Sequence, residues 1–143
     1  IGPLSELLEA SAEGRGPFVV AICLGFQLLA RSSAEGEADA REGLGAHAGR
    51  VEPLPQNERV PHIGWNDVSA AGTLSAGEAY FAHSYALFEA PAGWNASWCA
   101  HGDRFVAAVR RGRVTGAQFH PELSGAWGQR FMAQALGLED ASC

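Results

Sequence analysis

The sequence predicts a single α/β domain, and three observations carry that prediction. An apolar run rich in β-branched residues, "PFVVAI", stops at a cysteine and is followed at once by helical spacing. Later in the chain, apolar and polar residues alternate over several short runs, which is typical of strands. Helical spacing then returns near the carboxyl end. Interleaved signals of this kind favour a sheet covered by helices over a sandwich or a helical bundle.

The first part of the chain is predicted to form a helix, a parallel strand and a second helix. Residues 3–12 begin at a proline and place their leucines on one face, and the stretch "EGRG" ends that helix. Residues 17–22 form a continuous apolar run that suits a strand covered on both faces. The apolar residues after Cys23 recur with helical spacing until a polar stretch ends the pattern.

The second part is predicted to be mainly strands. Alternation is visible over residues 80–88 and again over residues 94–101. Residues 104–120 contain two strand-like runs separated by Arg111 and Gly112, which indicates a hairpin. From Gly125 the apolar spacing is helical again. The expected architecture is therefore a mixed sheet with an antiparallel extension and helices packed on it.

Length and composition exclude several classes of protein. The 143 residues suit one domain spanning 1–143. The net charge is −6 and the basic residues are scattered, so nucleic acid is not expected as a partner. No run reaches the roughly 18 to 20 apolar residues of a membrane span. The three cysteines lack metal-type spacing, which favours a reducing, cytoplasmic location, and no metal or organic cofactor is implied.

Cys23 has two possible interpretations. It stands where a buried strand ends and a helix begins, a turn that exposes the sulfur and favours the thiolate. Ala21 and Gly25 provide the small flanking residues that such a turn requires. The alternative is that Cys23 is an inert residue filling the core.

His120 and Glu122 provide a candidate base for this thiol. Pro121 disfavours helix at His120 and holds it extended, so His120 and Glu122 are expected to project to the same side. An imidazole backed by a carboxylate is the arrangement that activates a nucleophile. The alternatives are a solvated turn or two members of a metal site. Occurrence together with the Cys23 turn favours the nucleophile and base.

At this point the chain resembles a known family. The stretches "AICLGFQLL" and "GAQFHPELS" are similar to the two signatures of class I, triad-type glutamine amidotransferases, and the resemblance covers essentially the whole chain. It implies a flavodoxin-like three-layer fold and hydrolysis of glutamine to glutamate and ammonia. It also implies that Cys23 is the nucleophile, that His120 is the general base and then acid, and that Glu122 orients His120.

The middle of the chain narrows the resemblance. "VPHIGWNDV" and "YFAHSYAL" are similar to the glutaminase subunit of imidazole glycerol phosphate synthase, a histidine-pathway enzyme. The implied partner is a (β/α)8 cyclase subunit that forms a heterodimer and receives the ammonia. His62 and Trp65, in an expected loop, would lie at that interface. Leu123 replaces the family's usual basic residue, which puts one salt bridge to the cyclase in doubt, and Ala21 replaces a glycine.

The resemblance also implies a substrate site, with a role for each matching residue. The backbone N–H of Leu24 would stabilise the oxyanion. Glu35 would receive the α-amino group of glutamine, the alternative being a solvated charge, and for His83 the alternative is an ordinary strand histidine. His47 and His101 show no pairing and are expected at the surface. The residues expected to bind glutamine are Gln27, Glu35, His83, Ser84 and Tyr85.

The beginning of the chain departs from the family. Members normally carry a further amino-terminal segment with a first strand and a PGxG loop that completes the oxyanion hole, whereas "IGPLSELLEA" resembles the helix after that loop. Loss of one oxyanion donor typically lowers the rate on the order of 10² to 10³. We therefore expect little glutaminase activity from the 143-residue chain alone. The alternatives are an amidotransferase feeding another acceptor, or an impaired fragment that binds glutamine or a partner.

Overall fold

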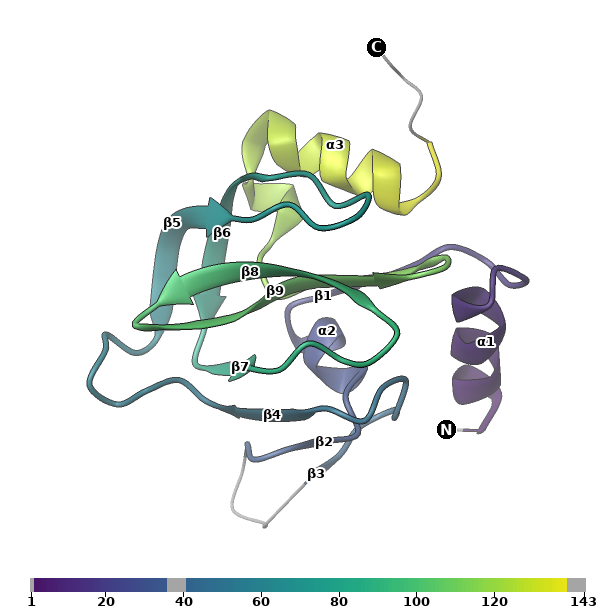
Figure 1. Cartoon of the computed structure of the whole chain (residues 1–143), viewed down its shortest axis with the longest axis horizontal. Helices are drawn as coiled ribbons and strands as arrows, with labels where there is room; N and C mark the ends of the chain where they lie inside the picture. The colour runs from purple at the N-terminus through teal and green to yellow at the C-terminus, as the bar shows by residue number, and fades with distance from the viewer. Residues whose placement is uncertain (1, 36–40, 139–143) are drawn as a thin grey trace.

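The computed structural model describes residues 2–35 and 41–138, and its architecture confirms the α/β prediction. Strands occupy the centre and helices lie on either side of them (Figure 1). In chain order the described elements are α1 (Gly2–Ala12), β1 (Val19–Ile22), α2 (Leu24–Leu28), β2 (Ser32–Ser33), β3 (Arg41–Glu42), β4 (Arg50–Pro53), β5 (His62–Val68), β6 (Gly77–His83), β7 (Tyr85–Leu87), β8 (Asn95–His101), β9 (Asp103–Arg111), β10 (Val114–Ala117), the 3-10 helix η1 (Pro121–Leu123) and α3 (Gly125–Ala135).

The main sheet has the strand order β1-β10-β9-β8. β1 runs parallel to β10, while β10, β9 and β8 are antiparallel to their neighbours, so the predicted mixed sheet with an antiparallel extension is confirmed. The predicted hairpin is β9–β10, and Gly112 takes a positive φ of 58° in its turn. Two smaller sheets, β3-β2-β4-β7 and β5-β6, complete the strands described.

Helices pack on both faces of the main sheet and create two apolar clusters. One cluster joins the sheet to α3 through Phe131, and the other joins it to α1 and α2 through Leu8 and Phe26. Side chains of β9 alternate between the clusters until the register shifts opposite Ser97 and Trp98. Ala107 and Ala108 therefore both face the α3 side, because a bulge residue breaks the two-residue alternation of a strand.

Three expectations about local structure need correction. β1 is only half-buried along its whole length, whereas a strand buried on both faces was expected, and within the described residues it pairs on one side only, with β10. The helix after Cys23 spans only Leu24–Leu28, and the chain turns into β2 soon afterwards. The stretch containing Trp65 is strand β5 and not a loop, because every residue of it pairs with β6.

The helices of the described residues are too short or too polar to cross a membrane.

Candidate active site

Cys23 occupies the sharp turn between β1 and α2 that the sequence predicts. Its φ of 53° and ψ of −105° make it the one non-glycine residue with a positive φ in the part of the chain that the structure describes. Such a conformation costs about 1–3 kcal/mol and is found at functional sites. The Cys23 N–H donates to the carbonyl of Ala117 at 2.7 Å, which ties the turn to the end of β10.

The surroundings of the Cys23 sulfur act on its charge in opposite directions. Burial raises the pKa of the thiol, and the negative charges of Glu122 and Glu35 raise it further. The backbone N–H of Leu24 lowers it, as a donor aimed at the thiolate does. Sγ also lies 3.9 Å from the carbonyl oxygen of Ala82. The sulfur is therefore held between elements far apart in the sequence.

His120 and Glu122 form the predicted pair. His120 is extended before Pro121, with φ −103° and ψ 99°, and its Nδ1 lies 2.8 Å from Oε2 of Glu122. Glu122 belongs to η1, so a helical turn and not a continued strand brings the carboxylate beside the ring. When Nδ1–H donates to this carboxylate, Nε2 is the acceptor nitrogen of the neutral ring. Ser124 Oγ donates to the His120 carbonyl at 2.7 Å and supports this geometry.

Parallel pairing of β1 with β10 brings these two parts of the chain to one edge of the sheet. Ile22 pairs with Ala117, so Cys23 lies next to Gln118, and His120 follows two residues later. Cys23 and the segment that leads to His120 therefore both lie where the carboxyl ends of adjacent parallel strands meet, a common position for active sites in α/β sheets.

Gln27 faces this edge, but its amide N–H groups are already used. Nε2 donates to the carbonyl of Tyr85 and to Oε1 of Gln118, both at 3.0 Å. Only its side-chain oxygen is left to contact glutamine in this arrangement. Ser84 accepts a backbone hydrogen bond from Leu54 at 2.9 Å, which fixes the corner between β6 and β7.

Glu35 lines a cavity of about 470 Å³ beside α2. Leu24 and Gln27 line the same cavity, together with Ser32 and Ser33. The backbone N–H of Glu35 donates to Ser33 Oγ at 3.1 Å. The cavity therefore joins the turn after Cys23 to a carboxylate, as a site for an amino acid requires.

His62 and His83 belong to one buried hydrogen-bonded chain. His83 Nδ1 donates to the Tyr85 carbonyl at 2.9 Å, so His83 Nε2 is the acceptor for His62 Nδ1 at 2.8 Å. Asn66 Nδ2 donates to His62 Nε2 at 3.2 Å and also to the Ala100 carbonyl. Burial, reinforced by neighbouring imidazoles, lowers the pKa of both histidines to about 4. The rings are neutral at pH 7.

The structure requires corrections to what the sequence predicts for four histidines. The His83 ring has both nitrogens occupied, so it supports the Tyr85 carbonyl from behind and does not face a ligand. His62 is buried, 5% exposed, so its side chain is not displayed to a partner. His101, expected at the surface without a partner, stacks on His62 with ring centroids 4.2 Å apart and contacts the Arg59 carbonyl. His47 is likewise buried, at 7% exposure.

The neighbouring face of β5 is exposed and apolar. Ile63 and Trp65 alternate with inward residues and are 60% and 54% exposed. Trp65 contacts Tyr80, whose backbone carbonyl accepts from the N–H of His120 at 2.9 Å. Leu123, also exposed, follows in η1. An apolar surface therefore borders the edge that carries Cys23 and His120.

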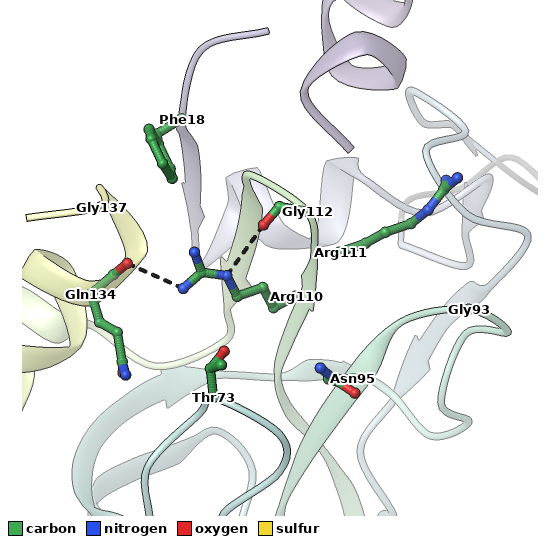
Figure 2. Close-up of a pocket in the computed structure, with 9 residues that line it drawn as sticks. All are labelled: Phe18, Thr73, Gly93, Asn95, Arg110, Arg111, Gly112, Gln134 and Gly137. Atoms are coloured by element: carbon green, nitrogen blue, oxygen red, sulfur yellow. Dashed lines mark hydrogen bonds between the residues drawn. The ribbon is translucent and has the colours of Figure 1, made fainter. Parts of the chain in front are cut away.

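A second cavity lies at the opposite end of the sheet. It has a volume of about 580 Å³ and lies by the β9–β10 turn, where Arg110 donates to the carbonyls of Gln134 and Gly112 (Figure 2). Phe18, which precedes β1, lies across from the guanidinium (Figure 2). None of the residues that line it is a predicted catalytic residue, so this cavity is separate from the candidate site.

Residues 3–136 match the family model described as glutamine amidotransferase class-I. The chain belongs to this family. A crystal structure of a glutamine amidotransferase has the same fold, with a TM-score of 0.66 and 22% identity over 95% of this chain and 69% of that one. A glutamine amidotransferase from Thermotoga maritima gives a TM-score of 0.54 at 19% identity, covering 94% of this chain and 52% of that one.

Within the amidotransferase family the relatives named imidazole glycerol phosphate synthase subunit HisH are similar to this chain, as the sequence resemblance predicts. The Zymomonas mobilis relative is 38% identical and aligns with 90% of this chain and 63% of its own length. The Leifsonia xyli relative is 40% identical, over 92% and 68% respectively. The chain thus spans about two thirds of the length of these relatives.

Three residues that contact the candidate site or the buried histidines were missed by sequence reasoning. Gln118 is fully buried and contacts both Gln27 and Cys23. Its position two residues before His120, on the same side of an extended segment, was a usable signal. Asn66 lies four residues after His62 on the same face of β5, a signal that was hidden because this stretch was expected to be a loop. His101 stacks on His62 from the distant strand β8, and no local pattern indicates this contact. Among residues 2–35 and 41–138, no group of three acidic, cysteine or histidine side chains is arranged to hold a metal ion.

Proposed function

We propose that this chain hydrolyses the side-chain amide of glutamine and provides the ammonia for an imidazole glycerol phosphate synthase in histidine biosynthesis. One observation carries the chemistry: the strained Cys23 lies at the end of β1, beside the strand that leads to the hydrogen-bonded His120–Glu122 pair. The names of the HisH relatives support the choice of pathway. A free thiol persists in a reducing compartment, which favours the cytoplasm as the location of this protein.

In the first step His120 Nε2 takes the proton of the Cys23 thiol. The sulfur attacks the side-chain carbonyl carbon of glutamine, a C–S bond forms, and the carbonyl oxygen becomes an oxyanion. The backbone N–H of Leu24, next to the sulfur, donates to that oxyanion, a contact typically worth on the order of 10² to 10³ in rate. Glu122 holds the ring in the required tautomer and stabilises the imidazolium.

In the second step the tetrahedral adduct collapses. The C–N bond breaks while His120 returns its proton to the leaving nitrogen, and ammonia departs. His120 then takes a proton from water, whose oxygen attacks the thioester carbon. The C–S bond breaks, glutamate leaves, and the sulfur recovers its proton from His120.

The cavity beside α2 is the proposed glutamine site. The Glu35 carboxylate receives the α-ammonium group, and the side-chain oxygen of Gln27 is available to a donor of the substrate. Ser84 and Tyr85 hold the corner against which Gln27 is anchored, with His83 behind them. A carboxylate that can pair with an ammonium group, together with one amide oxygen that can accept a hydrogen bond, suits a free amino acid.

The proposed partner is a (β/α)8 cyclase subunit that takes up the ammonia through an enclosed channel. The exposed apolar surface formed by Ile63, Trp65 and Leu123 lies next to the Cys23 edge. Large apolar and aromatic side chains of this kind anchor protein interfaces. A heterodimer formed there would place the ammonia source against its acceptor.

A glutamine-mimicking diazoketone tests the reaction, because such a reagent alkylates a thiolate only when bound as the substrate. We expect mass spectrometry to find the label on Cys23, with excess glutamine slowing its appearance. Cys99 is the internal control, since burial raises the pKa of its thiol to about 12. Equal labelling of Cys99 and Cys23, absence of a label, or no protection by glutamine would contradict the proposal.

A further inference from the structure

Gln118 is the buried residue that the proposed mechanism does not use. It follows β10, its backbone N–H donates to the Ala107 carbonyl at 2.8 Å, and its side chain is 0% exposed. A primary amide buried to this extent is expected to satisfy its donors and acceptor within the protein. Its side chain reaches Gln27 on one side and Cys23 on the other.

The orientation of the Gln118 amide follows from its partners. Gln27 Nε2 donates to the Tyr85 backbone carbonyl, which can only accept, so the nitrogen of Gln27 is placed without ambiguity. The same Nε2 lies 3.0 Å from Gln118, and the group facing it must be the Gln118 oxygen. The Gln118 NH2 is therefore turned toward Cys23, with Nε2 3.9 Å from Sγ.

An N–H group aimed at sulfur stabilises the thiolate more than the thiol. This matters at Cys23 because burial and two nearby carboxylates disfavour the negative charge there. The backbone N–H of Leu24 opposes them from the helix side. Gln118 adds a second donor, from the β10 side.

We propose that Gln118 holds the Cys23 thiolate through its side-chain N–H, and that Gln27 and the Tyr85 carbonyl fix the Gln118 amide for this purpose. The proposal deepens the proposed function and rests on Cys23 as its nucleophile. The thiolate is the attacking species, so a donor here sets the fraction of reactive enzyme at neutral pH. Gln118 would act on the sulfur and not on the substrate.

The test is the pH dependence of Cys23 alkylation by iodoacetamide, measured by mass spectrometry of the Cys23 peptide. Gln118→Met keeps the length of the side chain and removes its donor. We expect the midpoint of the alkylation profile to rise by about one pH unit, so that the rate near pH 7 falls roughly tenfold while the high-pH plateau is unchanged. Gln56→Met is the matched control, because Gln56 is exposed and its side-chain amide donates to the Leu54 carbonyl.

A second measurement keeps the proposal falsifiable. In the wild-type chain, the side-chain NH2 resonances of Gln118 are expected to titrate with the same midpoint as Cys23 alkylation. This requires no variant to fold. A midpoint unchanged in Gln118→Met, or a Gln118 amide that does not sense the titration, would overturn the role. A change in the plateau alone would indicate packing and would also overturn it.

Iodoacetamide does not need a glutamine site, so the two proposals fail separately. A shifted midpoint without diazoketone labelling would retain the Gln118–thiolate contact and reject glutaminase chemistry. Diazoketone labelling with an unshifted midpoint would retain the chemistry and reject the role of Gln118.

Discussion

Two histidine-containing regions of the molecule use the same side chain in opposite ways. His62 and His83 are buried, bond to each other and to neutral groups, and stay uncharged because burial lowers the pKa of each to about 4. His120 is partly exposed, with 24% of its side chain accessible, and bonds to the Glu122 carboxylate. Neutral histidines that bond to each other fix the positions of their neighbours, whereas a histidine that bonds to a carboxylate can take up a proton. The type of partner, and not the residue type, separates a structural histidine from a candidate base.

The largest difference between the two regions is expected in reactivity. His120→Ala removes the proposed base and should lower the rate of Cys23 labelling by the diazoketone on the order of 10² to 10⁴. His62→Leu should leave that rate within about tenfold, because its ring acts only through His83 and Tyr85. Peptide-resolved mass spectrometry over time measures both. Equal losses of labelling rate in the two variants would show that His120 and His62 do not differ in their effect on Cys23.

The Glu122 carboxylate should account for part of the His120 effect. Glu122→Gln keeps an acceptor oxygen for Nδ1–H but removes the charge that stabilises the imidazolium. We expect labelling to slow by about ten- to a hundredfold. Glu122 is 55% exposed, so the free energy of unfolding in urea should change by no more than about 0.5 kcal/mol. Destabilisation with unchanged labelling would make this a structural pair.

The buried histidine chain should instead affect stability. His62→Leu leaves His83 Nε2 without its donor and should lower the free energy of unfolding by about 1–3 kcal/mol. The double substitution with His83→Leu should cost less than the sum of the single ones, since it leaves neither nitrogen unpaired. Ile63→Ala, on the exposed face of the same strand, is the control and should change little. If the losses of unfolding free energy in the two single variants add up to the loss in the double variant, the two rings act independently.

The pH dependence of stability should also distinguish the buried histidines. His62 and His83 accept protons at about pH 4 when folded and at about pH 6.5 when unfolded. Between these values the unfolded chain binds more protons, so stability should fall as the pH drops from 6.5 toward 4 and be independent of these groups above 6.5. His47, whose pKa burial also lowers to about 4, adds to this trend. Urea unfolding at pH 7.5, 6 and 5 measures it, and His62→Leu should flatten the curve.

The edge that carries Cys23 and His120 was largely predictable because its signals are local. The break from an apolar run into Cys23 and Gly25 specifies a strand–turn–helix, and Pro121 specifies the extended His120. The hairpin β9–β10 follows from its alternation and its turn. Strand β5 was missed, since Gly64 and Asn66 weaken strand propensity and its stability comes from pairing with β6.

The histidines show where local reasoning stops. His47 and His101 carry no sequence signal of burial or pairing, so the surface position expected for His47 and the lack of a partner expected for His101 were wrong. His83 was correctly weighed as a possible ordinary strand histidine, but its partner His62 could be found only once β5 and β6 were paired. Cross-strand neighbours depend on register, which single-strand patterns do not encode.

The sequence by itself determined the kinds of element, the position of the thiol at a turn, and the local coupling of His120 to Glu122. Only the tertiary structure decided which donors surround the Cys23 sulfur, which histidines are neutral, and which side of β5 is exposed. The reason is physical: dihedral preferences and two-residue periodicity act over a few neighbours, whereas burial and hydrogen-bond partners are fixed by strand register between distant segments.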